Sequence, residues 1–166
     1  MSPPLPFAPE RHALEGCRLR PLEQADLADL AEQLAAIDPW ASLGYGAEAL
    51  ARYLGRSDSA LIRFALEHGE DSRAGILAVR HPWLRGPYIE VLAIFPAHQG
   101  HGLGKAVVEW AASQAARGAA NLWACVSDFN TSARRFYATQ GFAEVAPLDG
   151  LVSPGQSEIL LRKKLG

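Results

Sequence analysis

The stretch at residues 88–105, YIEVLAIFPAHQGHGLGK, joins an apolar run to a glycine-rich loop. The run at residues 88–95 is almost entirely apolar or β-branched and ends at Pro96, which is typical of a central strand covered on both faces. Three glycines follow on alternate positions, and residues 103–118 then repeat apolar side chains at helical spacing. The stretch therefore predicts a strand, a tight loop and a helix, an arrangement that favours anions at the helix N-terminus.

The spacing of the glycines excludes the two best-known phosphate loops. A GxxxxGK[ST] loop requires glycine at position 99 and a hydroxyl at position 106, where the chain has Gln99 and Ala106. A GxGxxG dinucleotide fingerprint requires its third glycine at Lys105. Because glycine lacks Cβ, the loop amides can still approach a diphosphate closely. The alternative is a strand-to-helix turn that uses glycine only for its backbone angles.

Composition limits the classes of function. The chain has 166 residues, of which 49% are hydrophobic and 20% charged, as expected for one globular domain. Sixteen basic residues against 18 acidic ones give a net charge of −2, which argues against binding to nucleic acid or to an anionic membrane. Cys17 and Cys125 lie far apart, so they predict neither a disulfide framework nor a zinc site.

The N-terminal residues differ from the rest of the chain. Residues 1–12 are rich in proline and lack the basic and apolar regions of a secretory signal, so we expect a flexible extension before a single domain at residues 13–166. No window approaches 18 uninterrupted apolar residues, so no membrane span is expected. A cytoplasmic location follows as the default expectation.

The remaining patterns predict a mixed α/β domain without internal repeats, in the order β-α-α-β-β-β-α-β-α-β-β. Strands are expected at residues 16–20, 60–67, 74–80, 88–95, 121–127, 142–146 and 157–165. Helices are expected at residues 21–37, 47–54, 103–118 and 131–140.

Two motifs in this order resemble the GNAT superfamily of N-acetyltransferases. Gln99, Gly102 and Gly104 fill the pattern of its pyrophosphate loop, between a strand and a helix. Downstream, the segment 121–142 carries Asn130, Ala133, Tyr137 and Gly141-Phe142 at the spacings of the family's following strand and short helix. The resemblance implies the α/β (α+β) GNAT fold, a single domain with a mixed sheet of about seven strands and about four helices, in which strands 4 and 5 splay apart.

The same resemblance implies acetyl-CoA as cosubstrate and no metal. The backbone of Leu92, Ala93 and Ile94 would bind the pantetheine arm in the gap between the splayed strands. Asn130 would bind near the same arm, and it is also a preferred helix N-cap residue. The full set of implied acetyl-CoA contacts is Leu92, Ala93, Ile94, Gln99, Gly100, His101, Gly102, Leu103, Gly104, Lys105, Asn130, Ala133 and Tyr137.

Tyr137 matches the family's general acid. A phenol with an ordinary pKa of about 10 is protonated at neutral pH and can donate to the departing CoA sulfur; the alternative is a core aromatic beside Phe136. In the resembling ribosomal-protein alanine acetyltransferases, a glutamate stands where this chain has Cys125. Some other members of the family carry a glutamate on the central strand, and Glu90 lies on this strand two residues from that position. Glu90 is therefore the expected base or the group that holds the acceptor. The alternative is a structural carboxylate with a partner.

The acceptor site is expected at residues 37–54, since in this fold the first two helices and the loop between them cover the acceptor. Asp38, Trp40 and Tyr45 would form an amine-binding wall, unless they only pack at a helix junction. His98 and His101 lack a third ligand nearby and are expected to be solvated beside the CoA phosphates. The implied reaction is direct attack of a primary amine on the thioester. The amine is expected to be a small molecule or a peptide or protein N-terminus, and the protein is expected to be a monomer or homodimer. A CoA-binding sensor without turnover is the alternative.

Overall fold

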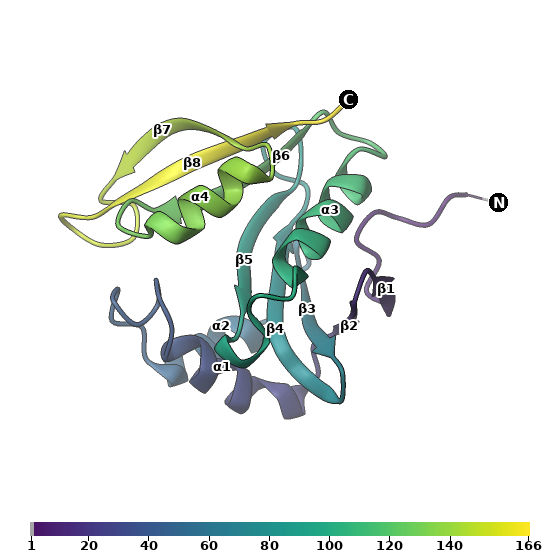
Figure 1. Ribbon diagram of the computed structural model, residues 1–166, viewed down its shortest axis with the longest axis horizontal. Helices are drawn as coiled ribbons and strands as arrows, with labels where there is room; N and C mark the ends of the chain where they lie inside the picture. The colour runs from purple at the N-terminus through teal and green to yellow at the C-terminus, as the bar shows by residue number, and fades with distance from the viewer. Residues whose placement is uncertain (1) are drawn as a thin grey trace.

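The computed structural model describes residues 2–166 and shows one mixed sheet with helices on both faces (Figure 1). The strands are β1 (His12–Leu14), β2 (Cys17–Pro21), β3 (Leu61–His68), β4 (Asp71–Arg80), β5 (Tyr88–Ile94), β6 (Asn121–Ser127), β7 (Ala143–Asp149) and β8 (Ser157–Lys164). The helices are α1 (Leu27–Ala35), α2 (Ala47–Gly55), α3 (Leu103–Ala115) and α4 (Thr131–Thr139), with short 3-10 turns η1 (Gln24–Asp26) and η2 (Pro96–His98). Within residues 2–166, no helix is long and apolar enough to cross a membrane.

The expected fold class is confirmed. The sheet order is β1-β2-β3-β4-β5-β6-β8-β7, and only the β5–β6 pair is parallel. The sequence analysis did not anticipate β1, a three-residue edge strand paired with β2. The expected splay is present, because β5 and β6 pair only at Tyr88 with Trp123 and at Ile89 with Ala124, after which the two strands diverge (Figure 1).

Two apolar cores lie on opposite faces of this sheet. On one face, α3 and α4 pack against β2–β6 and β8 around Val107, Leu122 and Leu161, each at most 2% exposed. On the other face, α1 and α2 bury their leucines against β3, β4 and β5. The second core ends at β5, so no helix of that layer covers β6 and β8 there. This leaves room for a cleft beside the splay.

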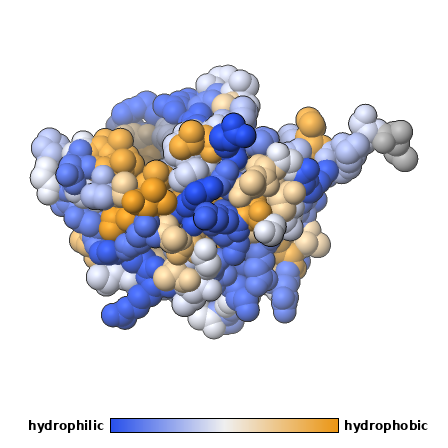
Figure 2. Space-filling view, turned by 90° about the horizontal axis from the view of Figure 1, so that it is seen from above, coloured by the Kyte–Doolittle hydropathy of each residue, from blue (hydrophilic) through white to orange (hydrophobic). Residues whose placement is uncertain are grey.

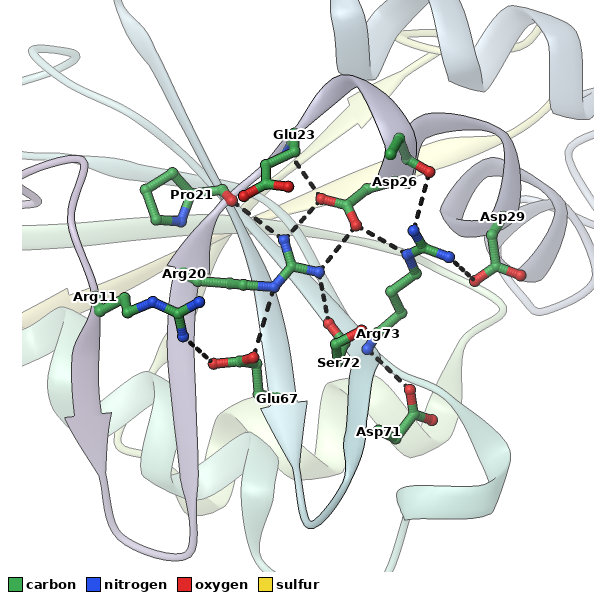
Figure 3. Close-up of polar contacts among 11 residues, drawn as sticks. Arg11, Arg20, Pro21, Glu23, Asp26, Asp29, Glu67, Asp71, Ser72 and Arg73 are labelled. Carbon is green, nitrogen blue, oxygen red and sulfur yellow. Dashed lines mark hydrogen bonds and ion pairs between the residues drawn. The ribbon is translucent and has the colours of Figure 1, made fainter.

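A buried ion network fixes the first turn after β2. Arg20 donates to Asp26 with both terminal nitrogens, at 2.7 and 2.9 Å, and Nε of Arg73 donates to Asp26 Oδ1 at 2.8 Å (Figure 3). Asp26 also accepts a bond from the backbone N–H of Glu23, which closes η1 and delays the start of α1 to Leu27. Burial raises the pKa of Asp26, but the bonds from Arg20 and Arg73 outweigh it and hold that pKa well below its ordinary value.

The N-terminal segment is anchored by Phe7, and Arg117 also donates to the carbonyl oxygen of Pro4. Phe7 is fully buried, with its ring against Trp110 and His81, and its backbone N–H donates to Oε1 of Gln114 at 3.2 Å. Residues 2–5 are exposed, and Figure 2 shows the N-terminal segment extending away from the body of the molecule. Residues 1–12 were expected to form a flexible extension, but Phe7 is buried and His12 already belongs to β1. Met1 lies outside the described residues.

Candidate active site

Two adjacent cavities occupy the cleft at the splay. The larger one, about 700 Å³, lies over the glycine loop and the start of α3, and we call it the loop cavity. The smaller one, about 330 Å³, lies between the α1–α2 connection and strands β5, β6 and β8, and we call it the sheet cavity. The residues that line both are Pro39, Trp40, Leu92, Asn130, Ala133 and Tyr137. A molecule in one cavity would therefore meet a molecule in the other at these side chains.

The glycines of the loop have different structural roles. Gly100 and Gly102 have φ of 81° and 75°, in the left-handed region that L side chains rarely adopt, and Gly102 is the N-cap of α3. Gly104 has a helical backbone, but a Cβ there would lie 3.2 Å from the Phe136 ring, so this glycine allows α3 to approach α4. The amides of the first turn have no partner inside the helix. The loop thus presents free N–H groups to the loop cavity.

Most of the residues expected to bind acetyl-CoA line the loop cavity. They are Leu92, Ala93, Ile94, Gln99, Gly100, Gly102, Leu103, Gly104, Lys105, Asn130, Ala133 and Tyr137. His101 is the exception, because its ring bonds back to the carbonyl oxygen of Gln99 at 3.0 Å instead of lining the cavity. Gln99 also has an internal partner, since its side-chain amide donates to the Ile94 carbonyl at 2.9 Å and ties the loop to the end of β5.

His98 lines the loop cavity and is not simply solvated as expected. Its Nδ1 lies 2.8 Å from Nδ1 of His68, and its Nε2 lies 2.7 Å from Oδ2 of Asp71. Both ring nitrogens are therefore used to fasten the start of the loop to the β3–β4 hairpin. Among residues 2–166, no group of three or more His, Cys, Asp or Glu side chains is arranged to hold a metal ion.

Helix α4 positions two of the expected residues. Asn130 is its N-cap, and Oδ1 of its side chain accepts a bond from the Ala133 N–H at 3.2 Å. Tyr137 lies two turns later, 8% exposed, with its ring edge-on to Phe136 and Phe142. Burial raises the pKa of Tyr137 above its ordinary value, so the hydroxyl stays protonated through neutral pH. The ring packs in the core and also lines both cavities, so its packing does not exclude the expected role as a proton donor.

Glu90 lines the sheet cavity, but both of its oxygens are engaged. Nε of Arg80 donates to Oε1 at 2.9 Å, and the Tyr53 hydroxyl donates to Oε2. A β-bulge makes Glu90 the extra residue of β5 between Ile89 and Val91, which consequently point into opposite cores. Burial and the bond to Glu90 raise the pKa of Tyr53. This geometry favours the partnered-carboxylate alternative.

The expected acceptor wall is divided between the cavities. Tyr45 lines only the sheet cavity, Asp38 only the loop cavity, and Trp40 both. Oδ1 of Asp38 accepts a bond from the Ser42 N–H at 3.0 Å, so this carboxylate also stabilises the turn that follows α1. The three residues lie near one another as expected, but Asp38 faces the side of the glycine loop.

Several groups of the sheet cavity were not expected from the sequence. Tyr53, Tyr88 and Glu158 line it, and Arg80 reaches its wall through Glu90. Glu158 carried a weak signal, since it is the one acidic residue in the apolar run 157–161. Tyr53 gave no such signal, because a tyrosine in an amphipathic helix is typical of packing. Its contact with Glu90 spans 37 residues.

The fold, the glycine loop at a helix N-terminus and a buried tyrosine between two adjacent cavities indicate a transferase. The sequence model of the Acetyltransferase (GNAT) family matches residues 26–142, and the chain belongs to that family. It is an acetyltransferase, and this family uses acetyl-CoA. No curated protein matches the sequence.

Solved structures agree with this assignment. An acetyltransferase from Thermus thermophilus is 25% identical, with 90% of this chain and 97% of that chain covered and a TM-score of 0.73. The ribosomal-protein-S18-alanine N-acetyltransferase from Escherichia coli is 20% identical, with 90% and 94% covered and a TM-score of 0.68. The spermidine N-acetyltransferase from Vibrio cholerae, in complex with CoA and spermine, is 19% identical, with 90% and 96% covered and a TM-score of 0.66. The last two show similarity of fold alone.

Proposed function

We propose that this chain transfers an acetyl group from acetyl-CoA to a primary amine by direct attack of the amine on the thioester. The observation that carries the proposal is the position of Tyr137, whose side chain lines both the loop cavity and the sheet cavity. A proton donor at that junction lies where the departing sulfur and the attacking amine would meet. Two of the acetyltransferases of known structure named above act on amines, according to their names, which agrees with such an acceptor.

The loop cavity fits acetyl-CoA. The free amides of the first turn of α3 and the positive end of its dipole suit a pyrophosphate. Lys105, 64% exposed and 3.8 Å from Glu109, is available for a phosphate contact. Residues Leu92–Ile94 pair with β4 on one side, while their other edge has no strand partner among the described residues. That free edge would bind the pantetheine arm as a neighbouring strand would.

The sheet cavity would hold the acceptor amine. Direct transfer forms the carbon–nitrogen bond as the carbon–sulfur bond breaks, and the thiolate takes the proton of the Tyr137 hydroxyl. The proton that the amine nitrogen loses on forming the amide then restores the Tyr137 hydroxyl. Burial raises the pKa of Cys125, which disfavours its thiolate at neutral pH. An acyl-cysteine intermediate is therefore less favourable than direct attack by a bound amine.

Two measurements on the full chain test the proposal. Acetyl-CoA at 100 times its Kd should raise the melting temperature by about 5–10 °C. A panel of primary amines and peptides with free N-termini should then release free CoA from acetyl-CoA. Stabilisation by acetyl-CoA without CoA release by any amine would favour the CoA-sensor alternative. The absence of both the melting shift and CoA release would overturn the acetyl-CoA site itself.

A further inference from the structure

The sheet cavity contains two carboxylates and no basic residue. Its charged lining residues are Glu90 and Glu158, from β5 and β8. A cationic ligand would therefore meet acidic groups only. A carboxylate can bind that ligand only if its own oxygens are not already engaged by other groups of the protein.

Glu90 has partners on both oxygens. Arg80 donates to it with Nε at 2.9 Å and with Nη2 at 3.3 Å, and Tyr53 donates to Oε2. The positive charge of Arg80 already balances this carboxylate, and Asp58 accepts from the remaining nitrogen of that guanidinium at 3.1 Å. An ammonium group would have to compete with a fixed guanidinium for Glu90.

Glu158 has no such partner. Its Oε2 is buried without a hydrogen-bond partner among the described residues, and no ion pair of that part of the chain includes it. Ser127 stands opposite Glu158 in the β6–β8 ladder, and its hydroxyl is near enough to lower the pKa of this carboxyl, although the side chains do not reach hydrogen-bond geometry. Burial outweighs Ser127 and raises the pKa of Glu158. A buried carboxylate oxygen without a partner is costly, so the unpartnered Oε2 of Glu158 favours a ligand.

The position of Glu158 follows from the splay. Residues opposite one another in an antiparallel ladder share a face, so Glu158 lies on the face of Ser127 and, by alternation, of Cys125. Helices α1 and α2 cover this face only as far as β5. Glu158 therefore borders the cavity instead of a packed helix, and Tyr137 lines the same cavity from α4, which packs on the opposite face of the sheet.

The rest of the cavity wall is mainly apolar and aromatic. Apolar and aromatic lining residues include Trp40, Leu43, Leu50, Val91, Val126 and Val152. These side chains come from the α1–α2 connection, α2, β5, β6 and the β7–β8 loop. Such a wall suits an apolar body, and one unpaired carboxylate suits one cationic group. A second ammonium in the same cavity would be buried without a counter-charge.

We propose that Glu158 binds the ammonium group of the acceptor and takes its proton before attack, and that the acceptor is a primary monoamine on an apolar or aromatic body. The inference rests on the proposed amine acetyltransfer. In the proton step, the ammonium and the Glu158 carboxylate give a neutral amine and a carboxylic acid. The neutral amine then attacks the thioester carbon. The same chemistry is offered by an arylalkylamine and by a peptide N-terminus that begins with an apolar residue.

Four full-length proteins test the role of Glu158: the wild type, Glu158→Gln, Glu158→Asp and the control Glu48→Gln, whose exposed glutamate lies on α2 outside the cavity. With phenethylamine, Glu158→Gln should lower kcat/KM by about 100-fold or more, Glu158→Asp by less, and Glu48→Gln by less than about threefold. The acetyl-CoA melting shift should be the same in all four. Without ligand, Glu158→Gln should melt at the same temperature as the wild type or about 1–4 °C higher, because it removes an unpaired buried charge.

The outcomes separate this inference from the proposed function. A Glu158→Gln protein that keeps phenethylamine kcat/KM within about threefold, or that melts well below the wild type, overturns the role of Glu158. The wild type should acetylate phenethylamine and a tripeptide with N-terminal leucine at least about tenfold better than spermidine. Equal or better use of spermidine overturns the acceptor class but leaves amine acetyltransfer intact. Loss of CoA release with every amine tested overturns both.

Discussion

Arg80 and Glu90 form an ion pair in the wall of the sheet cavity, with 2.9 Å between Nε and Oε1. The pair joins β4 to the bulge of β5. Because each side chain is only 21% exposed, water screens the pair weakly, and removal of one partner leaves a poorly solvated charge. The pair therefore favours the structural carboxylate that was the alternative expected for Glu90, and it identifies the partner that the sequence did not show.

Removal of this arginine should destabilise the protein. We expect Arg80→Ala to lower the free energy of unfolding by about 1–3 kcal/mol, less than for a fully buried pair because both groups are partly exposed. Urea unfolding at neutral pH measures the loss. The matched control is Arg52→Ala. Arg52 forms an exposed ion pair with Glu48, and its removal should lower the free energy of unfolding by less than about 0.5 kcal/mol. Equal losses in the two variants would contradict the structural role of Arg80.

Replacement of Tyr137 by phenylalanine tests the proton donor. Tyr137→Phe keeps the ring packing against Phe136 and Phe142, so the melting temperature and its rise with acetyl-CoA should stay unchanged. We expect kcat to fall by about 10²- to 10⁴-fold with the best amine of the panel. Because burial raises the pKa of Tyr137, the wild-type kcat should not decline from deprotonation of this group below about pH 10. Full turnover by Tyr137→Phe would exclude the role.

The left-handed backbone at Gly102 predicts a local sensitivity to substitution. Gly102→Ala should lower the free energy of unfolding by about 1–2 kcal/mol, because an L side chain is strained at a φ of 75°. It should also weaken acetyl-CoA binding, since Gly102 sets the direction of the first amides of α3. Gly118→Ala is the control, because no atom lies within 4 Å of its added Cβ and its φ is not positive. If both variants bind acetyl-CoA alike, the loop does not form the pyrophosphate site.

The buried network around Asp26 predicts acid sensitivity. Asp26→Asn should lower the free energy of unfolding by about 3–5 kcal/mol at neutral pH, because Arg20 and Arg73 lose the carboxylate they share and Arg20 keeps only its longer ion pair with Glu67, at 3.7 Å. The pKa of Asp26 is depressed in the folded protein, so its contribution is present above the ordinary carboxyl pKa and is lost as pH falls through that value toward the folded one. Urea unfolding between about pH 3 and 7 should therefore give a flatter acid slope for Asp26→Asn. Asp29→Asn, on a half-exposed side chain 3.9 Å from Arg73, should keep the wild-type slope.

Phe7 anchors the N-terminal segment, and its removal should be costly. Phe7→Ala should lower the free energy of unfolding by about 3–5 kcal/mol, as for other fully buried aromatic side chains. Leu5→Ala, at a side chain that is 78% exposed, should change it by less than about 0.5 kcal/mol. Chemical denaturation of the two variants compares them directly. A loss of similar size at both positions would show that the segment does not depend on Phe7.

Patterns within one segment were predictable. Strand β5, the glycine loop and α3 appear where the apolar run, the three glycines and the helical spacing place them, because these features depend on near neighbours in the chain. The cap of α4 by Asn130 was predicted for the same reason. Edge strand β1 was not, because three residues carry too little periodicity and are held by pairing with β2.

Partners that lie far apart in the sequence were not predictable. The bulge that makes Glu90 the extra residue of β5 depends on the pairing of β5 with β4, which the sequence does not show. Tyr53 and Arg80, from another helix and strand, then engaged both of its oxygens. The proline-rich composition of residues 1–12 likewise gave no sign that Phe7 would insert beside Trp110.

The sequence by itself determined the family of this protein and the location of its glycine loop, since glycine spacing, the Asn130 cap and Tyr137 are local features of order and distance along the chain. Only the tertiary structure decided which carboxylate of the sheet cavity has partners. Glu90 and Glu158 look alike in sequence, each an acidic residue in an apolar strand. Sheet register and the splay of β5 from β6 bring a guanidinium to Glu90 and leave Glu158 facing the cavity, because charge pairing depends on contacts between distant segments.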